Sequence, residues 1–443
     1  MKNKLIAAAI AAALSSVAYV PGANAQGTTE LEQLKAQLQA LSAKVEEMEK
    51  QQKAQVEAQE RTTDQIAQQR TNVGEWVSRF QWKGDLRYRN ETIDQEFTAQ
   101  KRNRDRIRLR AGFFARVNDT LRVEVQATTD EAIGGNGDAR SSNVTLSDAN
   151  SRKRFDIDTA YAEWTPTPNW RATFGKMRYP WLRPTGALFF DGDINPEGIS
   201  IGWQQGTTGL FVTGFWTQLA ERSAGPESTM GGAQLGWRGD IASGTRLTLA
   251  AAYFDHGAVE GWNAVQNADI ANAFGNSTST SALICRPGVT ACIANDFNVI
   301  EGFAELAMTM GGKPLTFFVD YAKNNEAERS SLASDQSLDT AYAGGIQLGR
   351  VANAHSWEVA YIYQKLENDA LYGQWVDSDF AGGVTGSQGH VFKFGYGFGR
   401  NFRFNATYFL NDTNIDVPTT ITGVGPVNDR EYKRLQLDIN MTF

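Results

Sequence analysis

The strongest constraint in the sequence is a two-residue alternation of apolar and polar side chains, which begins near residue 78 and continues to the C-terminus. Between residues 106 and 117 every odd-numbered residue is apolar, and four of the six even-numbered residues are arginine. Successive side chains of a β-strand point to opposite faces, so this pattern predicts strands with one apolar face and one polar face. Such strands need apolar matter on one side and water on the other.

Sixteen segments carry this alternation, and short turns alternate with long connections between them. They lie near residues 79–90, 104–117, 121–129, 155–164, 170–178, 197–203, 209–217, 230–238, 245–254, 297–309, 315–323, 339–349, 356–365, 389–398, 402–410 and 430–443. A soluble β-sandwich would not need long loops at one end only. We therefore predict an all-β fold over residues 78–443, a 16-stranded antiparallel transmembrane β-barrel. The prolines after residue 25 all fall in the predicted turns or loops, as strand interiors require.

The N-terminal part of the chain has a different character. Residues 1–25 combine Lys2 and Lys4, an apolar stretch and an Ala23-Asn24-Ala25 site, which predicts a secretory signal peptide. Residues 26–72 contain a heptad seam, formed by Leu31, Leu34, Leu38, Leu41, Val45 and Met48. The seam predicts a short α-helical coiled coil in the periplasm, with a solitary amphipathic helix as the alternative. A coiled coil implies an oligomer, but these residues do not set its number.

Composition excludes several classes of function. The formal charge is −7, which gives no reason to expect nucleic acid as a partner. The three histidines, His256, His355 and His390, stand in no recognisable relation to a nucleophilic serine, so we predict no catalytic site, and we predict no cofactor or metal. The two cysteines, Cys285 and Cys292, lie in the longest predicted loop and are a candidate disulfide in an oxidising compartment.

The signal peptide, the helical prefix, the sixteen strands and the terminal Phe443 occur in the order found in one known family. The chain resembles the putative-porin family of the Gram-negative outer membrane, in the form that carries a coiled-coil prefix, a layout also seen in sucrose and phosphate-selective porins. The resemblance implies a location in the cell outer membrane among its lipids, and a homotrimer of water-filled channels for passive diffusion of small hydrophilic solutes and ions. It also implies that the barrel-assembly machinery recognises Phe443. A channel selective for anions or sugars, and a structural or adhesive barrel, are the alternative functions.

A barrel of this size leaves an aqueous lumen, so the inward-facing charges matter for selectivity. The alternation assigns a set of basic residues to the lumen, which we call the basic wall: Lys83, Arg87, Arg89, Arg106, Arg108, Arg110, Arg116, Arg122, Lys393, Arg403 and Arg434. Four acids share these faces, namely Asp85, Glu124, Glu358 and Asp438. The alternative is that these are ordinary solvated residues with paired charges.

The third long loop, residues 179–196, is the candidate constriction. In general porins the third loop folds inward, and here it carries Asp191 and Asp193. If it folds inward, these acids are expected to face Arg106–Arg110 across less than a Debye length, about 8 Å at physiological salt. The resulting transverse field would favour polar solutes that can orient in it.

Overall fold

The computed structural model describes residues 27–131, 137–223, 225–263, 273–327, 337–422 and 424–443. The predicted signal peptide at residues 1–25 lies outside the described residues. The chain divides into two compact units, one ending at Ser78 and the other beginning at Arg79.

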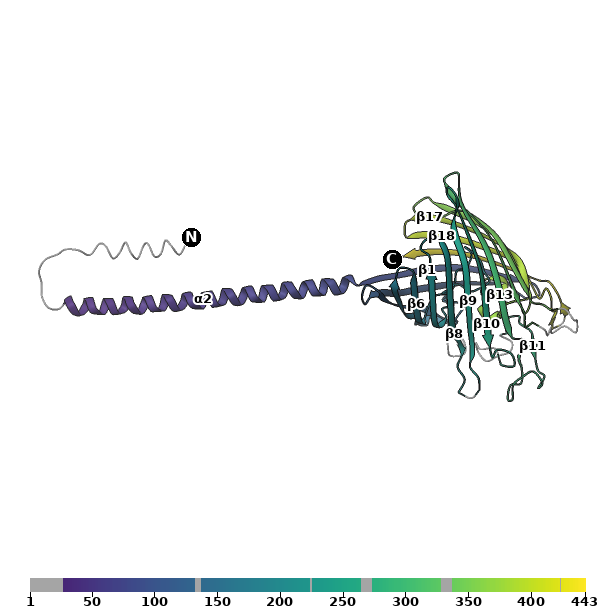
Figure 1. Cartoon of the computed structure of the whole chain (residues 1–443), viewed down its shortest axis with the longest axis horizontal. Helices are drawn as coiled ribbons and strands as arrows, with labels where there is room; N and C mark the ends of the chain where they lie inside the picture. Colours follow the sequence, from purple (N-terminus) through teal and green to yellow (C-terminus); the bar gives the residue numbers. More distant parts are fainter. Residues whose placement is uncertain (1–26, 132–136, 224, 264–272, 328–336, 423) are drawn as a thin grey trace. The chain divides into compact units, whose positions relative to one another are not determined.

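The described residues of the first unit form one α-helix, α2, which spans Gly27–Ser78 (Figure 1). It continues past residue 72, where the heptad pattern has already weakened. The seam residues Leu38, Leu41, Val45 and Met48 are all exposed on this single helix. An isolated helix cannot bury such a seam, so coiled-coil association stays a prediction. No helix among the described residues is long and apolar enough to cross a membrane.

The second unit is the predicted barrel of sixteen antiparallel strands (Figure 1). The strands are β1 (Phe80–Gln95), β2 (Arg102–Arg116), β3 (Leu121–Asp130), β5 (Arg154–Thr167), β6 (Trp170–Lys176), β7 (Glu197–Gln204), β8 (Gly209–Ala220), β9 (Ser228–Ala242), β10 (Thr245–Gly257), β13 (Phe297–Met310), β14 (Lys313–Asn324), β15 (Thr340–Gly349), β16 (Trp357–Leu366), β17 (Ser387–Gly399), β18 (Phe402–Thr413) and β21 (Arg430–Thr442). Each of them covers one of the segments predicted from the alternation. The 16-stranded fold is therefore confirmed.

The remaining elements lie in the long connections. A short strand, β4 (Val144–Thr145), adds to β2. Two small hairpins pair β11 (Thr278–Ser279) with β12 (Cys292–Ile293) and β19 (Thr419–Ile421) with β20 (Gly425–Val427). The described parts of these connections also contain three 3-10 turns: η1 (Asp148–Asn150), η3 (Gly373–Trp375) and η4 (Phe380–Gly382).

The barrel closes where its first strand pairs with its last. The β1–β21 register runs from Asp85 opposite Thr442 to Gln95 opposite Tyr432. The C-terminal residue extends this pairing, because the Phe443 and Gly84 backbone N–H groups each donate to the other residue's carbonyl, at 3.0 and 2.9 Å. Closure removes the unpaired edges that an open sheet would expose.

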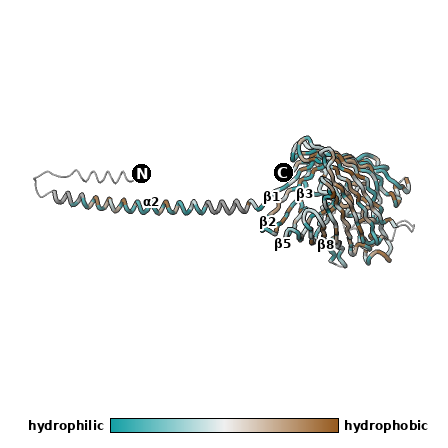
Figure 2. The backbone as a smooth tube through the Cα atoms, turned by 45° about the horizontal axis from the view of Figure 1, so that its top comes forward, coloured by the Kyte–Doolittle hydropathy of each residue, from teal (hydrophilic) through white to brown (hydrophobic). Residues whose placement is uncertain are grey.

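Hydrophobic and hydrophilic residues are mixed along the strands (Figure 2). The outward positions hold exposed apolar side chains, as in Ile300, Val319 and Tyr321. The inward positions differ around the barrel. On β1, β2, β18 and β21 they are mostly polar or charged, with Phe409 on β18 as a buried apolar exception, whereas β8, β10, β14 and β16 bury several apolar residues inside, for example Phe254 and Ile362.

The contact between Gly84 and Phe443 yields a prediction about closure. A Cβ atom at Gly84 would overlap the Phe443 ring and approach the Arg110 carbonyl. We expect Gly84→Ala to lower barrel stability by about 1–3 kcal/mol, a typical cost of overpacking. The midpoint of heat-induced unfolding, followed by the gel mobility of folded and unfolded protein, measures this change.

Gly214→Ala is the control, because a Cβ there meets no heavy atom within 4 Å. Equal midpoints for the Gly84 and Gly214 variants would contradict the proposed role of the closing contact.

Candidate functional site

The basic wall forms where the two ends of the barrel sequence meet. In the β1–β2 register Arg87 lies opposite Arg108, and Arg89 lies opposite Arg106. In the β1–β21 register Arg89 also lies opposite Asp438. Arg403 on β18 and Lys393 on β17 continue the wall on the far side of β21. Strand closure therefore brings charges from the two ends of the barrel sequence onto one inner surface.

Much of this wall is neutralised by buried carboxylates. Glu91 is fully buried and pairs with Arg434 and Arg104, while Gln436 donates to it at 3.2 Å. Asp438 accepts from Arg89 at 2.7 and 2.9 Å. Glu91 follows the same alternation as Arg87 and Arg89, but it lies just beyond the predicted first strand, which ends near residue 90. A predicted strand one residue longer would have placed Glu91 on the lumen face.

The remaining predicted basic residues form separate pairs. Asp85 accepts from Arg108 at 2.7 Å and from Arg110 at 2.6 Å. Lys83 donates to Glu124 at 2.6 Å. Arg116 and Arg122 lie exposed beside the β2–β3 turn, and Arg122 pairs with Glu163 at 2.9 Å. These last two residues do not join the others.

The connection between β6 and β7, residues 177–196, is largely buried. It packs on the apolar inner surface of the barrel, on the strands β8, β9 and β10. The Trp181 ring lies 4.5 Å from the Phe215 ring on β8 and 5.1 Å from the Phe254 ring on β10, centroid to centroid. Leu182 and Gln234 on β9 exchange two hydrogen bonds of 2.8 Å. Phe189 and Phe190 are also buried in this cluster.

A second buried loop, residues 367–386 between β16 and β17, joins the same apolar cluster through residues such as Trp375 and Phe380. From the sequence alone this segment was predicted only as a long connection. The sequence does carry a sign of its likeness to the 177–196 loop, because Asp377-Ser378-Asp379 stands between aromatic residues, much as Asp191-Gly192-Asp193 follows Phe190.

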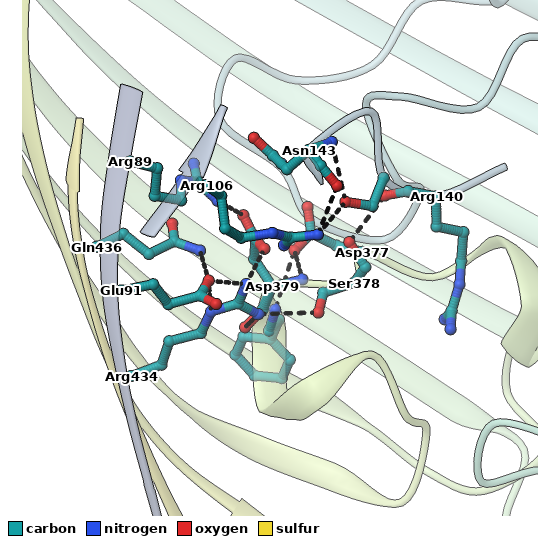
Figure 3. Close-up of polar contacts among 12 residues, drawn as sticks. Arg89, Glu91, Arg106, Arg140, Asn143, Asp377, Ser378, Asp379, Arg434 and Gln436 are labelled. Carbon is teal, nitrogen blue, oxygen red and sulfur yellow. Dashed lines mark hydrogen bonds and ion pairs between the residues drawn. The ribbon is translucent and has the colours of Figure 1, made fainter. Parts of the chain in front are cut away.

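The two loops meet through these acidic segments. The Asp191 N–H donates to the Trp375 carbonyl at 2.8 Å, and the Ser378 N–H donates to the Asp191 carboxylate at 2.7 Å. Asp379 contacts the basic wall, where it pairs with Arg89 at 3.2 Å and with Arg434 at 2.8 Å (Figure 3). Asp191 therefore joins one loop to the other, whereas Asp379 is the acid of the 367–386 loop that contacts Arg89 and Arg434.

The two predicted constriction acids have different surroundings. Asp193 lies 3.9 Å from both Arg108 and Arg110, and it accepts from the Ser142 hydroxyl at 2.9 Å. Asp191 pairs with no arginine of the wall among the described residues. Arg106 instead contacts Glu131 at 3.1 Å and the Asn143 carbonyl at 2.7 Å.

Burial and neighbouring charges divide the loop acids into two groups. Burial, followed by the charges of Asp377 and Asp193, raises the pKa of Asp191 well above its usual value. Burial and Asp379 raise the pKa of Asp377 to about 6. For Asp379 burial acts in the opposite direction, but Arg434 and Arg89 hold its pKa far below the usual value. Arg108 and Arg87 likewise overcome burial and lower the pKa of Asp193.

Two cavities lie along the charged wall. The smaller has a volume of about 350 Å³ and is lined mainly by Arg87, Arg89, Arg108, Lys393, Arg403, Asn405, Thr407, Asn440, Asp377, Asp379 and Asp438. The larger, of about 1090 Å³, lies among the long loops and has six arginines in its lining: Arg102, Arg104, Arg106, Arg140, Arg430 and Arg434. Water can therefore occupy the charged side of the lumen, whereas aromatic side chains pack together on the apolar side and leave a cavity of about 250 Å³ beside Leu182 and Phe211.

Two further features hold the long loops together. Cys285 and Cys292 are joined by a disulfide in the connection between β10 and β13. Arg140, which sequence analysis did not select, lies 3.7 Å from the Phe274 ring centroid and donates to the Gly383 carbonyl at 2.8 Å. No local sequence signal identifies Arg140, because its partners come from distant loops.

Comparison with one solved structure, that of OprB, supports the fold. The high-pH structure of Pseudomonas putida OprB matches with a TM-score of 0.53 at 9% identity, covering 84% of this chain and 96% of that chain. Salmonella typhi OmpF, in complex with daunomycin, matches with a TM-score of 0.47 at 11% identity, covering 82% and 97%. No curated protein matches the sequence.

The family comparison is more specific. The model of the family described as "Putative porin" matches residues 94–297 and 290–443, which together make up most of the chain. The chain therefore belongs to this porin family and is an outer-membrane protein with the fold of a channel rather than of an enzyme.

Proposed function

We propose that the protein is a trimeric porin in which small hydrophilic solutes diffuse along the charged wall of each barrel. One observation carries this proposal. The 177–196 and 367–386 loops pack on the apolar inner surface, while cavities of about 350 and 1090 Å³ remain beside the charged surface. A barrel of sixteen strands is wide enough for water, and here the loops narrow it by packing on the apolar surface and by pairing Asp193 and Asp379 with the arginines.

The charges on the two sides of this passage favour polar solutes. Loop acids such as Asp193 and Asp379 stand opposite Arg108 and Arg89 at ion-pair distances, well within a Debye length of about 8 Å. Because these acids contact the arginines, their field acts on the water and solutes beside the pairs. A dipolar solute can orient in such a field, whereas an apolar solute would displace water from charged groups without replacing their interactions.

Trimer formation is the second part of the proposal. The exposed seam on α2 supplies an apolar stripe that three copies could bury together, and family resemblance implies the trimer. The C-terminal Phe443 completes the β1–β21 closure, which fits the implied role of this residue as the assembly signal.

Planar-bilayer recording of the purified protein tests the pore. We expect stable conductance steps, and we expect Trp181→Ala to give larger and noisier steps. Truncating a buried tryptophan costs about 3–5 kcal/mol and would loosen the 177–196 loop. Trp216→Ala, the same change on the outer face of β8, should leave conductance unchanged.

Absence of conductance in the folded wild-type protein would contradict the channel proposal and favour the structural or adhesive alternative. Equal conductance in both tryptophan variants would show that the loop does not narrow the passage.

The ionisation of Asp377 predicts a pH dependence of ion selectivity. Its pKa of about 6 means that the carboxyl is protonated at pH 5 and charged at pH 7.5. Raising the pH adds a negative charge beside the smaller cavity, so preference for anions should fall with a midpoint near pH 6. Reversal potentials under a salt gradient measure this change. Asp377→Asn should abolish it, and an unaltered pH profile in that variant would contradict the assignment.

The seam predicts how oligomer stability responds to charge. Leu41→Asp places a carboxylate in the seam, so the oligomer should dissociate at a lower temperature than the wild type. Ala43→Asp is the control, because residue 43 is helical but lies off the seam. Native mass spectrometry after graded heating measures the oligomer. Identical dissociation of the two variants would contradict a coiled-coil role for α2.

A further inference from the structure

The inner surface of the basic wall has an unusual order of residues across its strands. At one level the register places Arg108, Arg87, Asn440 and Arg403 side by side on β2, β1, β21 and β18. We call these four residues the arginine row. Neighbouring strands lie about 4.8 Å apart, so three guanidinium groups share a short stretch of wall. Like charges placed directly opposite each other on adjacent strands are destabilising.

At the neighbouring level of the same strands, carboxylates offset the repulsion between adjacent arginines. Arg106 and Arg89 also lie opposite each other, but Asp438 continues that level on β21 and binds Arg89 at 2.7 Å. Asp379 and Glu131 supply two further carboxylates. The charges at this level are therefore compensated within the protein.

The arginine row has fewer ion pairs, although Asp193 and Asp379 lie close enough to interact with the charge of Arg87. Asn440 stands where the neighbouring level has Asp438. Arg87 donates to the Asn143 amide oxygen at 2.6 and 3.1 Å, and among the described residues neither Arg87 nor Arg403 forms an ion pair. Of the three arginines, only Arg108 pairs with a wall carboxylate, Asp85. Lys393 lines the same cavity without an ion pair among the described residues.

We propose that the arginine row is a binding site for a small oxyanion, a carboxylate or phosphate group, at the narrow part of the channel. Guanidinium groups bind such oxyanions through two parallel N–H···O bonds, which chloride cannot accept in the same geometry. The cavity of about 350 Å³ beside the row also presents Asn405 and Thr407, which can bond the rest of the solute. This inference rests on the proposed channel and names the class of solute that it prefers.

The test measures block of chloride current by an oxyanion. Inorganic phosphate or succinate is added to the wild-type channel in potassium chloride, and the concentration that halves the current is recorded. We expect millimolar block by at least one of the two probes, and the more potent probe identifies the preferred group. Arg87→Gln should raise the half-blocking concentration about tenfold or more, as expected for loss of charge-assisted hydrogen bonds.

Two control variants distinguish a site from a general positive potential. Arg116→Gln removes the same charge from β2 at its exposed end, and it should leave the block unchanged. Arg87→Lys keeps the charge but loses the paired donors, so it should behave like Arg87→Gln. Wild-type block in Arg87→Lys, or equal loss of block in Arg116→Gln, would overturn the site and leave only electrostatic attraction.

The unfolding temperature of the Arg87→Gln variant distinguishes an arginine kept for binding from one that only supports the fold. If Arg87, which forms no ion pair among the described residues, is kept for binding, Arg87→Gln should unfold at the same temperature as the wild type or higher. Phosphate or succinate should raise the unfolding midpoint of the wild type but not of the variant. A lower midpoint for Arg87→Gln would indicate a structural arginine. Chloride conductance without oxyanion block refutes the site alone, whereas no conductance refutes the channel.

Discussion

Closure of the sheet between β1 and β21 is the constraint on which the rest of the structure depends. It removes the free edges of the barrel, and it also decides which side chains become neighbours across 350 residues of chain. Glu91 forms an ion pair with Arg434, and Arg89 forms one with Asp438, only because the first and last strands pair in this register. These pairs are buried, so removing one partner would leave an uncompensated charge, a loss of about 3–5 kcal/mol. The charged wall and the closed barrel are thus mutually dependent.

The lumen has two unlike sides, and this division determines where solutes can pass. On the apolar side, Trp181, Trp375 and Phe380 from two loops pack against inward residues of the strands. Burial of that aromatic surface stabilises the loops inside the barrel. On the charged side, Asp193 and Asp379 of these loops contact the arginines, and cavities remain beside these pairs. The narrowing therefore results from apolar packing on one side and from ion pairs on the other.

The fold was predictable to a greater extent than the site. Alternation identified all sixteen strands because each strand contacts lipid on its outer face, and the long and short connections established the topology. The same rule assigned Arg87, Arg89 and Arg108 to the lumen, since their orientation depends only on parity. The coiled-coil segment predicted over residues 26–72 stays a prediction, and the helix itself extends to Ser78, because helical backbone does not require the heptad seam to continue.

The electrostatic state of the wall could not be predicted locally. The partners of Arg89 and Arg434 include Asp379, which comes from a loop whose path is determined by tertiary packing of Trp375 and Phe380. Asp191 and Asp193 were both expected to face the arginines. Only Asp193 does so, because the backbone of the 367–386 loop provides a closer donor for Asp191. A repeated Asp-x-Asp segment beside aromatic residues was the one signal in the sequence that linked the two loops.

The central claim is that water and solute pass along the charged side of the lumen and not along the apolar side. Accessibility of single cysteines to a charged thiol reagent tests it most directly. Thr407→Cys lies beside the smaller cavity, and Ala343→Cys lies in the buried apolar cluster. The account predicts that the reagent reduces conductance of the Thr407→Cys channel and does not change that of Ala343→Cys. Modification of Ala343→Cys with Thr407→Cys left unreactive would contradict it.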